Sequence, residues 1–153
     1  MNESTNRIEK QILLKAPRSR IWRALANPQE FGDWFGVKMS GPMMAAGQHL
    51  SGNITYKGYE HLVMEIWIEK VEPEWHLSWR WHPAAIEAGV DYSAEATTLV
   101  EFDLQEVEGG TLFKVVETGF DQLPLARRAK VLGMNTRGWE EQMVNIEKYV
   151  AAH

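Results

Sequence analysis

The sequence contains no cysteine, which excludes disulfide bonds, thiolate metal sites and a cysteine nucleophile. It also contains no long hydrophobic run. The polar amino terminus, MNESTNRIEK, lacks the apolar segment of a signal peptide, and the apolar runs elsewhere are too short to cross a bilayer. These absences predict a cytoplasmic protein that does not insert into a membrane.

Basic residues are few and scattered, and the usual motifs of nucleotide and metal chemistry are missing. The 16 Lys and Arg stand against 21 Asp and Glu, which gives a formal net charge of −5, and no basic run could follow a phosphate backbone. The sequence has no GxGxxG or GxxxxGK loop, no GxSxG elbow, and no metal-ligand spacing among its five histidines. It therefore argues against a nucleic-acid partner, a metal and any other cofactor.

The chain does contain enough apolar material for one core. Of its 153 residues, 44% are hydrophobic and 24% are charged, values typical of a single globular domain spanning residues 1–153. Seven tryptophans are many for this length. Side chains of that size line either a thick core or an aromatic pocket.

Periodicity and turn residues predict an α+β domain. Apolar alternation predicts a strand over residues 7–15, and helical spacing predicts two short helices on either side of the Asn-Pro break at 27–28. Glycine and proline divide residues 36–120 into six further antiparallel strands, the last two joined by Gly-Gly at 109–110. A long amphipathic helix follows Pro124. The expected order is β-α-α-β-β-β-β-β-β-α, with a curved antiparallel sheet wrapped around the terminal helix.

Two segments of this order allow two interpretations each. Residues 82–96, HPAAIEAGVDYSAEA, are too many for a tight hairpin and form either a lid over a pocket or a surface excursion. Gly133 and Gly138 weaken the terminal helix by about 1 kcal/mol each relative to alanine. They either permit close packing on the sheet or loosen the helix for ligand entry.

With WHLSWRWHP, TTLVEFDLQEVEGGTLFKVVETGF and GWEEQMVNIEKYV in their expected places, the chain resembles the SRPBCC superfamily. Within it the chain is similar to the branch related to the activator of heat-shock-protein-90 ATPase, over about residues 7–150. The resemblance implies the helix-grip fold, also found in START lipid-binding domains and birch-pollen-allergen-like proteins. In that superfamily an elongated cavity lies between the concave sheet and the last helix. None of the resembling motifs is a catalytic signature.

Strand parity selects the side chains that would face such a cavity, because successive side chains of a strand point to opposite faces. Trp79 and Trp81 share a face. They form either a flat apolar wall for an aromatic ligand or part of a core packed against Trp139 and Met143. Phe102 faces inward from the next strand.

Phe113 and Glu117 share a face of the strand after that. A carboxylate there could act as a hydrogen-bond donor or general acid in the cavity. Because glutamate is rarely fully buried, we expect instead that Glu117 reaches water near the strand end. His49 lies on the polar face of residues 48–56, which by default faces solvent. The alternative places His49 in the cavity, where it could exchange a proton with Glu117.

Three functions are compatible with these residues. The first is binding of a small hydrophobic or aromatic molecule between sheet and helix, with these candidate ligand-binding residues: Trp79, Trp81, Phe102, Phe113, Glu117, Trp139, Met143 and His49. The second is a cyclase, dehydratase or hydrolase, which the resemblance also implies, with Glu117 as the acid-base group. The third is an interaction module that contacts a chaperone, by analogy with the ATPase activator. A homodimer is compatible with all three.

Overall fold

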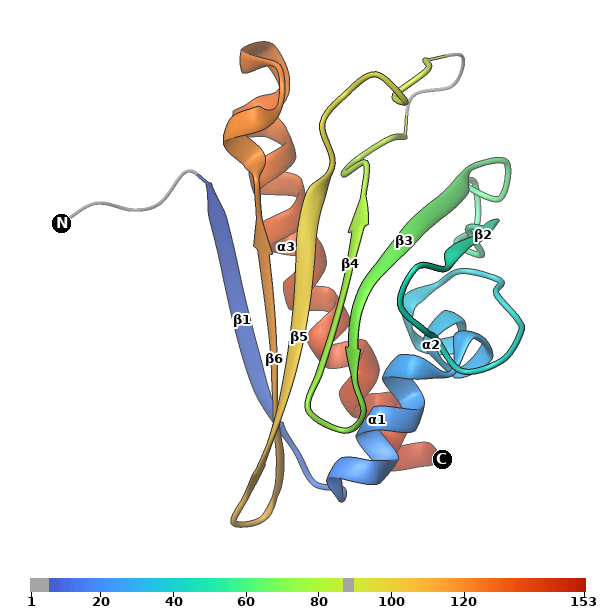
Figure 1. The fold of residues 1–153 in the computed structure, drawn as a ribbon, viewed down its shortest axis with the longest axis vertical. Helices are drawn as coiled ribbons and strands as arrows, with labels where there is room; N and C mark the ends of the chain where they lie inside the picture. The colour runs from blue at the N-terminus through green and yellow to red at the C-terminus, as the bar shows by residue number, and fades with distance from the viewer. Residues whose placement is uncertain (1–5, 87–89) are drawn as a thin grey trace, which may run out of the picture.

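One six-stranded antiparallel sheet and a long carboxy-terminal helix dominate the computed structural model, which describes residues 6–86 and 90–153 (Figure 1). In chain order the elements are β1 (Arg7–Leu14), α1 (Arg18–Ala26), α2 (Pro28–Phe35), β2 (His49–Asn53), β3 (Val63–Glu72), β4 (His76–Trp81), β5 (Thr98–Val107), β6 (Gly110–Thr118), the short 3-10 helix η1 (Phe120–Gln122) and α3 (Leu125–Ala152). The sheet order is β1-β6-β5-β4-β3-β2. The first strand therefore lies beside the last, and all other neighbours are consecutive along the chain.

The predicted α+β helix-grip class is confirmed, with one strand fewer than expected among the described residues. The expected strand after Gly36 is reduced to a single bridge between Val37 and Ile54. Gly36, with φ of 100°, ends α2 in the left-handed conformation and turns the chain. Beyond it, isolated bonds such as Met44 N to Ala26 O at 2.9 Å replace a ladder. An extended sequence without a neighbouring strand satisfies its backbone as a loop.

The predicted hairpin of β5 and β6 is confirmed. Gly109 and Gly110 have φ of 89° and 149°, values that favour glycine. A Cβ atom on Gly110 would also lie 2.1 Å from the carbonyl oxygen of Leu14, so this glycine lets the end of β1 pass close to the turn. The resulting register places Glu117 opposite Val100.

The terminal helix α3 runs along one face of the sheet, behind the strands in Figure 1. Its buried side chains include Trp139, Met143 and Ile146, whereas Glu140 and Glu147 are exposed, so the predicted amphipathic pattern is confirmed. None of the described helices, α3 included, is long and apolar enough to cross a membrane.

The predicted alternation of inward and outward side chains is confirmed on the face of the sheet that α3 covers. Inward side chains of three strands are buried, except at the end of β4, where Trp81 is half-buried; the buried ones include Leu77, Trp79, Val100, Phe102, Leu104, Phe113 and Val115. Because one face of each strand is buried in this way, the register of the sheet is tightly fixed.

The three helices are joined at Glu30. Its carboxylate accepts hydrogen bonds from Arg20 Nη1 at 2.9 Å, Arg23 Nε at 2.8 Å and the Tyr149 hydroxyl at 3.0 Å. Burial raises the pKa of Glu30, but the hydrogen bonds from Arg20 and Tyr149 and the charges of both arginines outweigh burial and hold the pKa below its usual value of 4.5. The charged carboxylate therefore stabilises the junction of α1, α2 and α3.

Acid unfolding should report this junction. The pKa of Glu30 is lower in the folded state than in the unfolded state. The contribution of Glu30 to the free energy of unfolding is therefore complete above the unfolded-state pKa and is lost as pH falls through the folded-state pKa. Glu30→Gln should lower the free energy of unfolding at pH 7 and flatten its decline below about pH 4.5, as measured by urea denaturation. The exposed Glu108→Gln serves as control. An unchanged decline in Glu30→Gln would show that Glu30 does not contribute.

Candidate functional site

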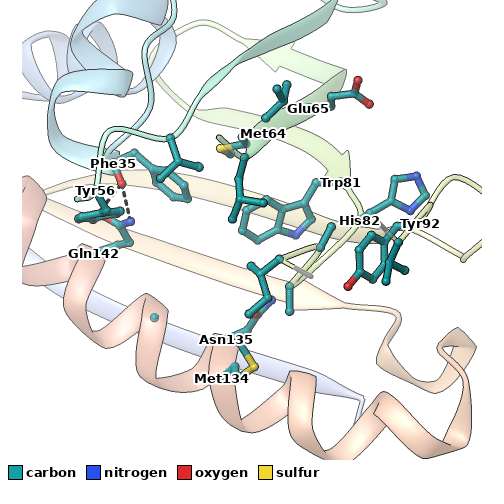
Figure 2. Close-up of a pocket in the computed structure, with 18 of the residues that line it drawn as sticks. Phe35, Tyr56, Met64, Glu65, Trp81, His82, Tyr92, Met134, Asn135 and Gln142 are labelled. Atoms are coloured by element: carbon teal, nitrogen blue, oxygen red, sulfur yellow. Dashed lines mark hydrogen bonds between the residues drawn. The ribbon is translucent and has the colours of Figure 1, made fainter. Parts of the chain in front are cut away.

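A cavity of about 770 Å³ lies between the sheet, α3 and the segments that connect β2 to β3 and β4 to β5 (Figure 2). Phe35, Trp81 and Trp139 form its aromatic wall, and Tyr56 and Tyr92 lie around it. The three wall rings contact one another, with centroid separations of 5.8 to 6.1 Å. The cavity therefore offers a preformed aromatic surface.

The two tryptophans of β4 have different roles, so each of the two interpretations of this pair applies to one residue. Trp79 is fully buried in the core and lies 6.2 Å from Phe31 of α2, between ring centroids. Trp81 is half-buried and lines the cavity. The difference follows from position, because Trp79 lies in the interior of β4 and packs against Phe31 and Phe102, whereas Trp81 is the last residue of the strand.

Glu117 lies behind this wall and is completely buried. Oε1 accepts from Trp139 Nε1 at 2.8 Å and from Asn135 Nδ2 at 3.0 Å. Oε2 accepts from Trp81 Nε1 at 2.8 Å, Thr98 Oγ1 at 2.6 Å and Asn135 Nδ2 at 3.2 Å. All of these partners are uncharged donors, a pattern that suits a carboxylate acting as acceptor on both oxygens.

The expectation that Glu117 reaches water is therefore wrong. β6 is paired on both sides, with Ile8 of β1 and Val100 of β5 opposite Glu117, and the tryptophans of the wall close the inward face. Full burial is tolerated because the carboxylate is saturated with hydrogen bonds. Glu117 does not line the cavity itself. It acts on the cavity by holding the two indoles and the Asn135 amide in place.

Asn135 and Gly138 of α3 both lie on the cavity wall, one turn apart. Apart from the backbone of α3 itself, a Cβ atom on Gly138 would meet no atom within 4 Å, and one on Gly133 would meet only the side chain of Arg137, at 3.7 Å from Nη1. Neither glycine is required for close packing on the sheet, so that interpretation is wrong. At Gly138 the missing side chain leaves space in the cavity.

His49 lies on the exposed face of β2, as the default interpretation predicted. Its ring stacks on Trp67 with centroids 4.8 Å apart, and its Nε2 lies 3.9 Å from Glu65 Oε2. Its partners are thus these two residues of β3, and the structure does not pair it with Glu117.

The remaining candidate residues lie in the core. Phe102 and Phe113 are fully buried and stack with centroids 5.7 Å apart, and Met143 of α3 is buried in the same core. None of the three is among the residues that line the cavity. They support the wall from behind, with Phe102 5.8 Å from Trp139 between centroids.

Part of the segment 82–96 borders the cavity. Residues 87–89 lie outside the described residues, so the lid interpretation is not tested for them. Tyr92 and His82 line the cavity, and His82 Nδ1 is buried without a hydrogen-bond partner in the described part of the chain. Arg127 of α3 holds the segment by donating to the carbonyl oxygen of Pro83 at 3.2 Å and by an ion pair with Glu95 at 2.9 Å.

A metal site has no structural support within residues 6–86 and 90–153, where no group of three or more His, Cys, Asp or Glu side chains could hold an ion. The polar groups of the described lining residues are amides, hydroxyls, indole N–H groups, one imidazole and carboxylates. These groups can orient a ligand by hydrogen bonds.

Solved structures share this architecture. Protein MLL2253 from Mesorhizobium loti superimposes with a TM-score of 0.74 at 20% identity, covering 95% of this chain and 97% of that one. A protein from Arthrobacter aurescens gives 0.75 at 16% identity, covering 99% and 91%. DynU16, described as a putative protein in the dynemicin biosynthetic locus, gives 0.72 at 18% identity, and the match covers 95% of this chain but 47% of DynU16. At these identities the likeness establishes the fold.

No curated protein matches the chain in sequence. The family described as "Activator of Hsp90 ATPase homolog 1-like protein" matches residues 15–151, which is most of the chain and includes the aromatic wall and α3 up to its penultimate residue. The helix-grip architecture agrees with this match, and the chain belongs to the Activator of Hsp90 ATPase homolog 1-like protein family, of SRPBCC type.

Proposed function

We propose that the protein binds a small, uncharged, mainly aromatic molecule in the cavity between the sheet and α3. The observation that carries this proposal is the cavity of about 770 Å³ walled by Phe35, Trp81 and Trp139. Its size falls in the range of small-molecule sites, which are typically lined by apolar and aromatic side chains with a few polar groups. Edge-on and offset ring contacts with such a wall favour a planar ligand.

The charges around the cavity select against anions. Its lining includes the carboxylates of Glu65, Asp91 and Glu141, and no lysine or arginine is among the described lining residues. The whole chain adds a formal net charge of −5. An anionic ligand would have to enter against this field without a cation to meet it, whereas an uncharged ligand loses nothing.

Titration with N-phenyl-1-naphthylamine tests the proposal, because this uncharged dye fluoresces in apolar surroundings. We expect saturable binding of one dye per protein in the micromolar range, with energy transfer from tryptophan. Linear, non-saturating fluorescence at protein concentrations up to about 100 μM would contradict the proposal.

The seven indole N–H signals in a nitrogen-proton correlation spectrum locate the dye. The signals of Trp81 and Trp139 should shift on titration because both rings line the cavity. Trp75, which is 55% exposed on the turn between β3 and β4, is the internal control and should not move. Shifts confined to Trp75 would indicate adsorption to the surface.

The alternative of an enzyme with Glu117 as acid-base group gains no support from the geometry. Each carboxylate oxygen already accepts at least two hydrogen bonds, and the carboxylate is separated from the cavity by Trp81, Asn135 and Trp139. Proton transfer needs a direct approach to the ligand or one bridging water.

A further inference from the structure

The side-chain amide of Asn135 has an orientation that its surroundings fix. Its Nδ2 lies 3.0 and 3.2 Å from the two oxygens of Glu117. The Trp81, Thr98 and Trp139 groups on the same carboxylate are all donors to it, so Glu117 acts as acceptor toward each partner. If the amide turned over, its carbonyl oxygen would face a carboxylate oxygen. Asn135 therefore cannot rotate without losing both hydrogen bonds.

The consequence is a free acceptor on the cavity wall. Asn135 lines the cavity, and its Oδ1 accepts no hydrogen bond from any described residue. Oδ1 is also not a fully buried atom that lacks a partner. His82 Nδ1, by contrast, is buried without a hydrogen-bond partner in the described part of the chain. Figure 2 shows Asn135 rising from α3 toward Trp81. The carbonyl oxygen thus stands beside the aromatic wall, open to a ligand.

We infer that the cavity selects an uncharged aromatic molecule carrying a hydroxyl or N–H group, which donates to Asn135 Oδ1 while the ring packs on Trp81 and Trp139. This inference rests on the proposed function and adds to it the polar group that the ligand must carry. Asn135 is the specificity-determining residue, and Glu117 is a positioning residue that acts through it. The border carboxylates Glu65, Asp91 and Glu141 are acceptors too, so they also disfavour a ligand that offers acceptors alone.

A matched pair of biphenyls tests the inference by competition with N-phenyl-1-naphthylamine. 4-Phenylphenol carries a donor, and 4-methoxybiphenyl has the same rings with the donor replaced by a methyl ether. In an apolar cavity without a free acceptor the ether binds tighter, because its methyl group gains burial and it has no hydroxyl to desolvate. With Asn135 Oδ1 available we expect 4-phenylphenol to bind about five- to tenfold tighter, the effect of one net hydrogen bond.

Asn135→Ala assigns the preference to its residue and should remove it, leaving the ether equal to or tighter than the phenol. Should that variant fail to fold, wild-type spectra keep the inference testable. The Asn135 side-chain amide signals should shift farther with 4-phenylphenol than with 4-methoxybiphenyl, because the ether adds only the ring-current effect that both molecules share. Equal affinities in the wild type, or a preference that survives Asn135→Ala, would overturn the inference and leave the proposed function standing. Absence of binding by the dye and both biphenyls would overturn both.

Discussion

Gly138→Phe should abolish binding of N-phenyl-1-naphthylamine without loss of stability. A side chain at this position enters open space, since a Cβ atom there meets no atom within 4 Å. Helical side chains lean toward the amino terminus, so the phenyl ring would cover the turn that carries Asn135. It would then occupy the place of a ligand ring beside Trp81. We expect at least about a 100-fold loss of affinity in the dye titration, corresponding to roughly 2.7 kcal/mol.

Gly138→Ala is the matched control. Its methyl group is too small to fill the cavity, so dye affinity should change by less than about threefold. Removing a glycine from the interior of α3 should raise the free energy of unfolding by about 1 kcal/mol. Gly138→Phe should gain about half as much from helix propensity. Loss of binding in both variants would indicate that backbone flexibility at Gly138, rather than the space beside it, is needed.

Glu117→Gln should destabilise the protein by about 2 to 3 kcal/mol, although it changes one atom. An amide has one accepting oxygen, whereas Trp81, Trp139 and Asn135 together need acceptors on both sides of the group. The hydroxyl of Thr98 can rotate to accept, but an indole N–H cannot. Whichever way the glutamine amide turns, one buried indole donor faces another donor. Thermal unfolding should show a midpoint lower by about 5 to 10 °C for a chain of this length.

Two comparisons sharpen the Glu117 result. Glu108→Gln, in the exposed turn between β5 and β6, should stay within about 0.5 kcal/mol of the wild type. Glu117→Gln should also abolish the preference for 4-phenylphenol, since Asn135 is no longer held with its carbonyl toward the cavity. If Glu117→Gln left the free energy of unfolding unchanged, the hydrogen bonds to the carboxylate would not stabilise the fold. A direct chemical role for Glu117 would then need to be tested.

The periodicity of the sequence was sufficient to predict the architecture. Alternation in β5 and β6 identified the buried face, and helical spacing in α3 identified the buried stripe, because these patterns are properties of single elements. The prediction of a strand after Gly36 was wrong because strand pairing is not a property of a single element. Whether an extended stretch joins a sheet depends on a free neighbouring edge, and that edge is set by chain segments remote from it.

The site was predicted less well, because its members act through contacts between elements. Parity correctly put Trp79 and Trp81 on one face, but only the packing of Phe31 and Phe102 around Trp79 makes it core, whereas Trp81 at the strand end is cavity wall. The burial of Glu117 required donors from β4, β5 and α3 at once. The sequence signal for the role of Asn135 was its spacing of four residues from Trp139, which puts both on one face of α3. That signal is weak unless the burial of the Glu117 carboxylate, which both residues contact, is known.

The pairing of β1 with β6 has a consequence for biosynthesis. Arg7 pairs with Thr118 and Leu14 with Thr111, so β1 leaves the ribosome well before its partner in the sheet, which is made roughly a hundred residues later. Until then its apolar residues and backbone groups have no place in the sheet. The sheet therefore cannot be completed until β6 has been made, and β1 is exposed to pairing with other chains until then. Stalled or truncated chains ending before β6 should be recovered in the aggregated fraction.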